Sequence, residues 1–65
     1  MIPVNSEAVS AIGYSNGELY VAWRNSGKTY TYPGVSVATY DALMASDSKG
    51  KFIAQHIRHL GGKPL

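Results

Sequence analysis

The 65-residue chain contains no cysteine, which excludes disulfide scaffolds, zinc ribbons and thiol chemistry. It also lacks any run approaching the roughly 18 apolar residues of a membrane-spanning helix. Residues 1–5 have neither the basic start nor the apolar stretch of a signal peptide. We therefore expect a cytoplasmic protein that is neither secreted nor embedded in a membrane.

Charged residues are scarce at 15%, whereas hydrophobic residues make up 45%, a composition that excludes a disordered tail and a coiled coil. The length allows one core, so residues 1–65 are expected to form a single domain. A chain this short buries only about 60% of its unfolded surface and often depends on self-association for stability. We expect a homo-oligomer.

Three segments have the pattern of an antiparallel meander. Residues 8–14 and 18–24 are separated by Asn16-Gly17, a strong hairpin signal. A second turn ends at Gly27, and the alternating residues 28–32 stop before Pro33, which ends strand pairing. The residues expected on the core face of the middle strand are Leu19, Val21 and Trp23.

Two short helices are predicted after the strands. The first follows Ser36 as N-cap, and the second runs from Lys49 or Gly50 to Leu60 and stops at Gly61. The apolar stripes are Val37, Tyr40, Leu43 and Met44 in the first helix, and Ile53, Ile57 and Leu60 in the second. The predicted fold class is α+β: a three-stranded antiparallel meander followed by two helices packed on one face, in the order βββαα.

A set of spaced residues covers nearly the whole chain: Ile12-Gly13-Tyr14, Leu19, Val21, Gly27, Tyr30-x-Tyr32, Val35, Tyr40, Leu43, Ala45, Ser48-x-Gly50, Phe52 and Ile57. Their order and spacing resemble the KTSC domain, a small module named after the C-terminus of some lysyl-tRNA synthetases. Two positions differ from the usual family pattern: Ser36 replaces a proline, and His59-Leu60-Gly61 replaces a closing tyrosine. The resemblance implies a small nucleic-acid or nucleotide-binding module.

Positive charge gathers at the C-terminal end. The last 17 residues contain four cations and no acid: Lys49, Lys51, Arg58 and Lys63. Ser48-Lys49-Gly50 opens the second helix, where unpaired backbone N–H groups favour an anion and Lys49 or Lys51 can add charge-assisted bonds. The alternative is that Ser48 only caps the helix and the lysines are solvated.

Two histidines in the second helix raise the question of chemistry. Phe52, His56, His59 and Lys63 are predicted to share one helix edge. His56 and His59 alone are too few ligands for a structural or catalytic metal. Because they point the same way, they are also poorly placed to flank a scissile bond. We therefore predict no metal, no cofactor and no enzymatic activity.

Tyrosines interleaved with cations offer a surface for stacking bases. Tyr30 and Tyr32 share one strand face, and Arg24 or Lys28 is placed to contact a phosphate. The alternative is that most of these rings are core. The predicted stacking residues are Tyr14, Tyr30, Tyr32 and Phe52, and the predicted phosphate-binding residues are Ser48, Lys49, Gly50, Lys51, His56, Arg24 and Lys28.

These observations predict a non-catalytic nucleotide-binding protein, a homo-oligomer that sequesters a cyclic di- or oligonucleotide. In size and architecture it resembles small phage proteins that act as sponges for defence signals. One alternative is a module for single-stranded RNA, against which the net charge of only +2 argues. A second alternative is a protein-interaction module whose interface contains the tyrosines.

Overall fold

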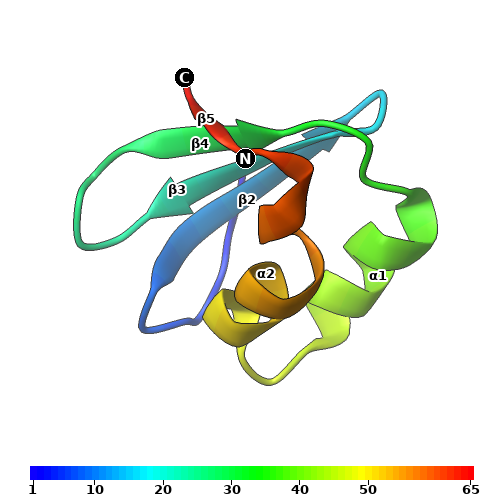
Figure 1. The fold of residues 1–65 in the computed structure, drawn as a ribbon. Helices are drawn as coiled ribbons and strands as arrows, with labels where there is room; N and C mark the ends of the chain where they lie inside the picture. Colours follow the sequence, from blue (N-terminus) through cyan, green and yellow to red (C-terminus); the bar gives the residue numbers. More distant parts are fainter.

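A five-stranded antiparallel sheet with helices on one face forms the protein, in a computed structural model that describes residues 1–65 (Figure 1). The strands follow the chain in the order β1-β2-β3-β4-β5, so each pairs with its sequence neighbours. The elements are β1 Ile2–Pro3, β2 Val9–Ser15, β3 Glu18–Trp23, β4 Thr29–Tyr32, α1 Val37–Ala45, α2 Lys49–His56, a 3₁₀ turn η1 Arg58–Leu60, and β5 Lys63–Pro64. The α+β class is confirmed.

The β2–β3 hairpin is built as the sequence predicts. Ser15 pairs with Glu18, and the two residues between them both have positive φ, 51° at Asn16 and 78° at Gly17. This conformation requires residues such as asparagine and glycine, which tolerate the left-handed region, and its twist matches that of the flanking strands. The Asn-Gly pair therefore sets the register of the central hairpin.

The predicted number of three strands is wrong, because the two ends of the chain add an edge strand each. Ile2 pairs with Ile12 on one side of the sheet, and Lys63 pairs with Thr31 on the other. Each edge strand has two residues and contains a proline, which is tolerated at a sheet edge. Segments this short show no alternation, so the sequence pattern could not reveal them.

Helix α1 begins as predicted, since the Ser36 side chain accepts a hydrogen bond from the Thr39 amide at 3.1 Å. Leu43 is fully buried, but Val37 is 62% exposed, so its predicted place in the apolar stripe is wrong. The helix is only nine residues long and packs on the core through its later turns, at Tyr40, Leu43 and Met44. Its first turn lies outside the core.

Helix α2 is shorter than predicted. It ends at His56 instead of Leu60, and the chain continues as the 3₁₀ turn η1 with a hydrogen bond from the Leu60 amide to the Ile57 carbonyl at 2.9 Å. Such tighter turns are common at helix ends. Gly61 then takes a left-handed conformation at φ 79°, as expected of a helix stop signal.

The core lies between the sheet and the two helices. Nine residues are buried. Five of them were expected on the core faces of the middle strand and the helices: Leu19, Val21, Leu43, Ile53 and Ile57. Ile57 is fully buried because η1 folds the chain back toward β5. Neither α-helix has the length and apolar character needed to cross a bilayer. The core residues are Val9, Ile12, Leu19, Val21, Tyr32, Val35, Leu43, Ile53 and Ile57.

Candidate functional site

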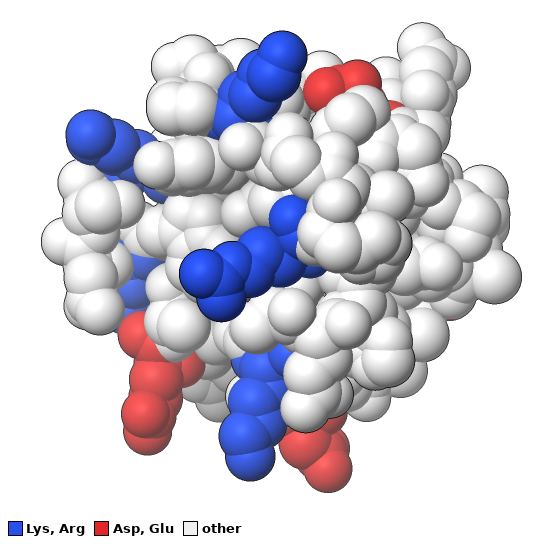
Figure 2. Space-filling view, viewed as in Figure 1, with Lys and Arg blue, Asp and Glu red and all other residues white.

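Lysine and arginine side chains spread across the face of the molecule that carries α2 and β5 (Figure 2). Aspartate and glutamate side chains appear on this face only near its margins. The predicted gathering of positive charge toward the C-terminal segments therefore produces a face that favours anionic ligands.

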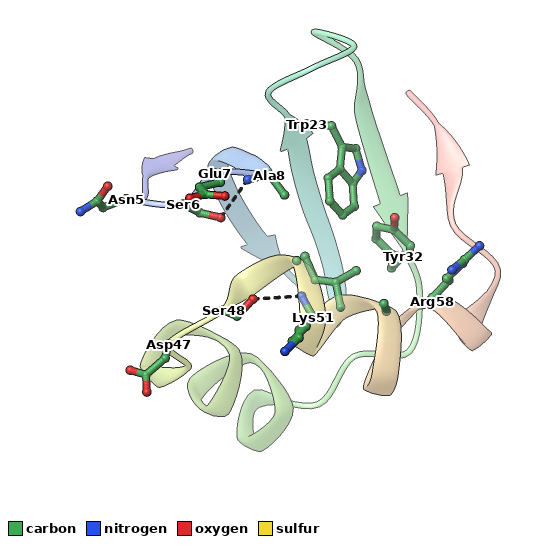
Figure 3. A pocket seen from close by; sticks show the side chains of 13 residues that line it. Asn5, Ser6, Glu7, Ala8, Trp23, Tyr32, Asp47, Ser48, Lys51 and Arg58 are labelled. Atoms are coloured by element: carbon green, nitrogen blue, oxygen red, sulfur yellow. Dashed lines mark hydrogen bonds between the residues drawn. The ribbon is translucent and has the colours of Figure 1, made fainter.

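An open groove of about 810 Å³ lies between α2, the end of β3 and residues 5–8, which lead into β2 (Figure 3). Its volume is within the roughly 300–1,000 Å³ that small-molecule sites occupy. We call it the α2 groove. The residues that line it are Asn5, Ser6, Glu7, Ala8, Trp23, Tyr32, Asp47, Ser48, Gly50, Lys51, Ile53, Ala54 and Arg58.

The first turn of α2 forms one wall of the α2 groove. Ser48 caps the helix, and its hydroxyl accepts a hydrogen bond from the Lys51 amide at 3.4 Å. The amides of Lys49 and Gly50 precede the helical hydrogen-bond ladder and have no intrahelical acceptor. Together with the exposed Lys51 ammonium group, they create a positive region at the groove.

Two aromatic side chains form the opposite wall. Trp23 at the end of β3 points toward α2, and Tyr32 at the end of β4 lies beside Trp23 (Figure 3). Trp23 is half-buried, whereas Tyr32 is only 5% exposed. Trp23 therefore offers more of its ring to a ligand, and Tyr32 belongs mainly to the core.

The environment of Tyr32 is unusual for a tyrosine. Burial raises the pKa of its hydroxyl above the ordinary value of 10.0, while a hydrogen bond with Trp23 and the positive charge of Arg58 act in the opposite direction. The hydroxyl is therefore protonated at neutral pH. Its ring lies against Gly62, where a Cβ atom would overlap the ring atoms.

The third wall, residues 5–8, is held in place by hydrogen bonds that Arg24 donates to backbone carbonyl groups in and next to this segment. The Arg24 side chain donates from Nε to the Ser6 carbonyl at 3.0 Å and from Nη2 to the Val9 carbonyl at 3.2 Å. The Arg24 amide also donates to the Ala8 carbonyl at 2.9 Å. Ala8 in turn lies close to Gly50, where an added Cβ would be 3.0 Å from the Ala8 Cβ. The wall is thus held against both β3 and α2.

Four predicted site residues meet in the α2 groove: Ser48, Gly50, Lys51 and Tyr32. Four other predicted phosphate contacts, including His56 on α2, lie elsewhere. Lys49 donates its ammonium proton to the Ser46 carbonyl at 2.6 Å, Arg24 holds residues 5–8, and Lys28 lines a smaller cavity of about 370 Å³ beside β5.

The predicted stacking residues are also dispersed. Tyr14 stacks on Tyr40 with ring centroids 4.6 Å apart, and its hydroxyl donates to the Val35 carbonyl at 2.6 Å. Tyr30 is half-buried and pairs with Pro64. The contacts of Tyr14 give it a structural role in the packing of α1. This agrees with the alternative interpretation, in which most of the tyrosine rings belong to the core.

The predicted helix edge is interrupted. Phe52 and His56 lie 4.7 Å apart by ring centroids on α2, but His59 belongs to η1 and Lys63 to β5. None of these four residues lines the α2 groove. No group of three or more histidine, cysteine or acidic side chains is arranged to hold a metal ion.

Sequence reasoning left Trp23, Arg58 and residues 5–8 out of the predicted site. Trp23 was placed on the core face, and Arg58 counted only as part of the basic end. Both line the α2 groove, as does Glu7. Glu7 lies on the segment before β2, whose position depends on the pairing of β2 with β3. The register of this pairing shifts between Val9 and Ala11, and no sequence pattern predicts that shift.

The fold and groove define a small α+β domain with a preformed polar and aromatic cleft. The sequence profile of the KTSC domain matches residues 5–60, and the chain belongs to this family. A protein of Tsukamurella paurometabola is 41% identical over 54 residues, which cover 82% of this chain and 81% of that protein. The crystal structure of a KTSC domain protein from Yersinia pestis superposes with a TM-score of 0.78 at 35% identity, covering 97% of this chain and 86% of the other. The expected family membership is confirmed.

Proposed function

We propose that this KTSC domain is a non-catalytic protein that binds a small phosphorylated nucleotide in the α2 groove. The observation that carries the proposal is that Trp23 and Lys51 line the same groove. A groove that offers both an aromatic ring and a cation suits a ligand that has a flat base and a phosphate.

The phosphate is assigned to the start of α2. Unpaired amides at a helix N-terminus bind anions through the helix dipole and direct hydrogen bonds. Lys51 adds a charge-assisted contact, and Gly50, next to it in the first turn, also lines the groove. Ser48 contributes by capping the turn that presents these amides.

The base is assigned to Trp23. Stacking of a base on an aromatic side chain contributes about 1–3 kcal/mol to binding. The indole is half-buried, so one part of the ring is fixed in the fold and the remainder is available to a ligand. Tyr32 lies next to Trp23 and is buried too deeply to be the main stacking partner.

A second cation favours a ligand with two separated phosphates. Arg58 comes from η1 and lies beside Tyr32, away from Lys51 at the start of α2 (Figure 3). Cyclic dinucleotides have two phosphates held apart by a closed ring. We infer a ligand of this class, sequestered by a cytoplasmic homo-oligomer in which a second copy covers the open side of the groove.

The composition of the groove supports the proposal that the ligand is retained without conversion. The groove contains no histidine, cysteine or metal-ligating cluster that would activate a nucleophile near the phosphates. These features support a binding role.

Calorimetric titration with cyclic di-GMP and cyclic di-AMP tests this proposal, with a short single-stranded RNA as comparison ligand. We expect Lys51→Ala to weaken cyclic dinucleotide binding about tenfold or more, because charge-assisted hydrogen bonds contribute roughly 1.5–3 kcal/mol. Lys28→Ala is the matched control, since Lys28 is exposed and outside the α2 groove.

Equal binding by both variants would contradict the assignment of the groove. Binding of RNA alone, with affinity that falls steeply with salt, would replace the proposal by an RNA-binding role. Absence of binding to every ligand would leave a protein-interaction module as the remaining alternative.

A further inference from the structure

The α2 groove is chemically two-sided. Lys51 and Arg58 provide positive charge along α2 and η1, Asp47 adds a carboxylate directly before the Ser48 cap, and Glu7 introduces a second carboxylate on the wall formed by residues 5–8. A carboxylate is unexpected in a site for an anion, because it repels phosphate. Its presence calls for a ligand that has hydrogen-bond donors at the end opposite to its phosphates.

Glu7 lines the same groove as Trp23 and lies on the segment that leads into β2. Val9 pairs with Trp23, and the Ala8 carbonyl accepts from the Arg24 amide at 2.9 Å, so the chain at Glu7 runs past the end of β3. The flanking carbonyl groups of Ser6 and Ala8 are already occupied by Arg24. The carboxylate of Glu7 is outside this network and is exposed.

A base stacked on Trp23 would present one edge to this wall. Guanine has two parallel donors on its Watson–Crick edge, N1–H and the N2 amino group, which match the two oxygens of a carboxylate. Adenine has one donor on that edge, at N6, next to the N1 lone pair, which a carboxylate repels. Glutamate accepts hydrogen bonds only, so it distinguishes the two bases.

We propose that the α2 groove is specific for guanine nucleotides and that Glu7 is the residue that reads the base. This inference rests on the proposed function, because it requires a nucleotide with its base on Trp23 and its phosphates near Lys51. A bidentate contact of this kind discriminates between bases by roughly 5- to 150-fold in affinity.

The test is a pair of calorimetric titrations, cyclic di-GMP and cyclic di-AMP, against wild type and Glu7→Gln. We expect wild type to favour cyclic di-GMP by at least fivefold, in line with the lower bound for a bidentate contact. Glu7→Gln keeps the size of the side chain and replaces one acceptor oxygen by a donor. We expect it to bring the two affinities to within about twofold, because it loses one acceptor for guanine and the charge that repels adenine N1.

Asp47→Asn separates base recognition from simple charge. Asp47 also lines the groove, but its carboxylate points away from Trp23 (Figure 3). We expect this variant to change both affinities together and to retain the preference for guanine. A loss of preference in Asp47→Asn equal to that in Glu7→Gln would overturn the role of Glu7.

The two proposals fail in different ways. If wild type binds both cyclic dinucleotides with equal affinity, guanine recognition is wrong and the nucleotide-binding role stands. If wild type binds neither, both proposals are wrong. Far-ultraviolet circular dichroism of each variant verifies that the substitutions, both at exposed positions, leave the fold intact.

Discussion

The guanidinium group of Arg24 donates to the carbonyl oxygen of Ser6 at 3.0 Å and so joins the end of β3 to the segment before β2. A second bond from the same side chain reaches Val9 at 3.2 Å. The hydroxyl of Ser6 meanwhile accepts from the amides of Ala8 and Val9, each at 3.3 Å. This network holds the wall that contains Glu7, although Arg24 itself does not line the groove.

Removal of the Arg24 side chain is expected to loosen this wall. Arg24→Ala should lower the free energy of unfolding by about 1–2 kcal/mol, because two charge-assisted bonds are lost at a largely exposed position. Urea denaturation followed by circular dichroism measures the effect. Lys28→Ala provides the control, since the Lys28 side chain makes no hydrogen bond and should leave the unfolding free energy within about 0.5 kcal/mol. Identical midpoints for the two variants would contradict the role of Arg24.

Gly62 is predicted to be intolerant of any side chain. A Cβ at this position would overlap the ring of Tyr32, which is held in the core. Gly62→Ala should therefore destabilise the fold by roughly 1–3 kcal/mol, the usual cost of overpacking. A thermal melt measures this change, and Lys63→Ala next to it serves as comparison because Lys63 is exposed. An unchanged melting temperature in Gly62→Ala would show that β5 can move away from the sheet at little cost.

Stability is expected to fall at alkaline pH through Tyr32. Burial raises the pKa of its hydroxyl in the folded state above the ordinary 10.0. Above that pH the unfolded chain releases this proton while the folded chain still holds it, so rising pH favours unfolding. Below pH 10.0 both states are protonated and the contribution is fully retained. Urea midpoints at about pH 9 and about pH 11 measure the loss.

Tyr32→Phe isolates this contribution, because every other ionisable group is unchanged. The loss of stability between the two pH values should be smaller in the variant than in wild type. An equal loss in both proteins would show that Tyr32 ionises in the folded state as it does in water.

Local signals account for the parts of the fold that the sequence predicts correctly. Asn16-Gly17 sets the hairpin and Ser36 and Ser48 cap the helices, each through bonds within a few residues. The edge strands depend instead on distant pairings, such as Ile2 with Ile12 and Lys63 with Thr31. No short-range pattern encodes these pairings, and they formed the main error in the predicted fold.

The candidate site divides along the same line. Ser48, Gly50 and Lys51 follow from the start of a helix, which local sequence reveals. Trp23 and Glu7 come together only through the register of β2 against β3, which contains an irregularity between Val9 and Ala11. Tyr14 was predicted to stack on a base, but its ring packs on Tyr40. Composition does not distinguish a tyrosine ring that packs inside the protein from one that is exposed to a ligand.

The prolines of the border strands limit how copies of this chain can associate. Strand β1 contains Pro3 and strand β5 contains Pro64, so each two-residue border has only one backbone N–H. A neighbouring molecule would find too few donors there to extend the sheet by a further strand. Copies of this domain must therefore associate through side chains on the helices or on the faces of the sheet. Substitutions on those surfaces, and not at the border strands, are expected to change the number of subunits.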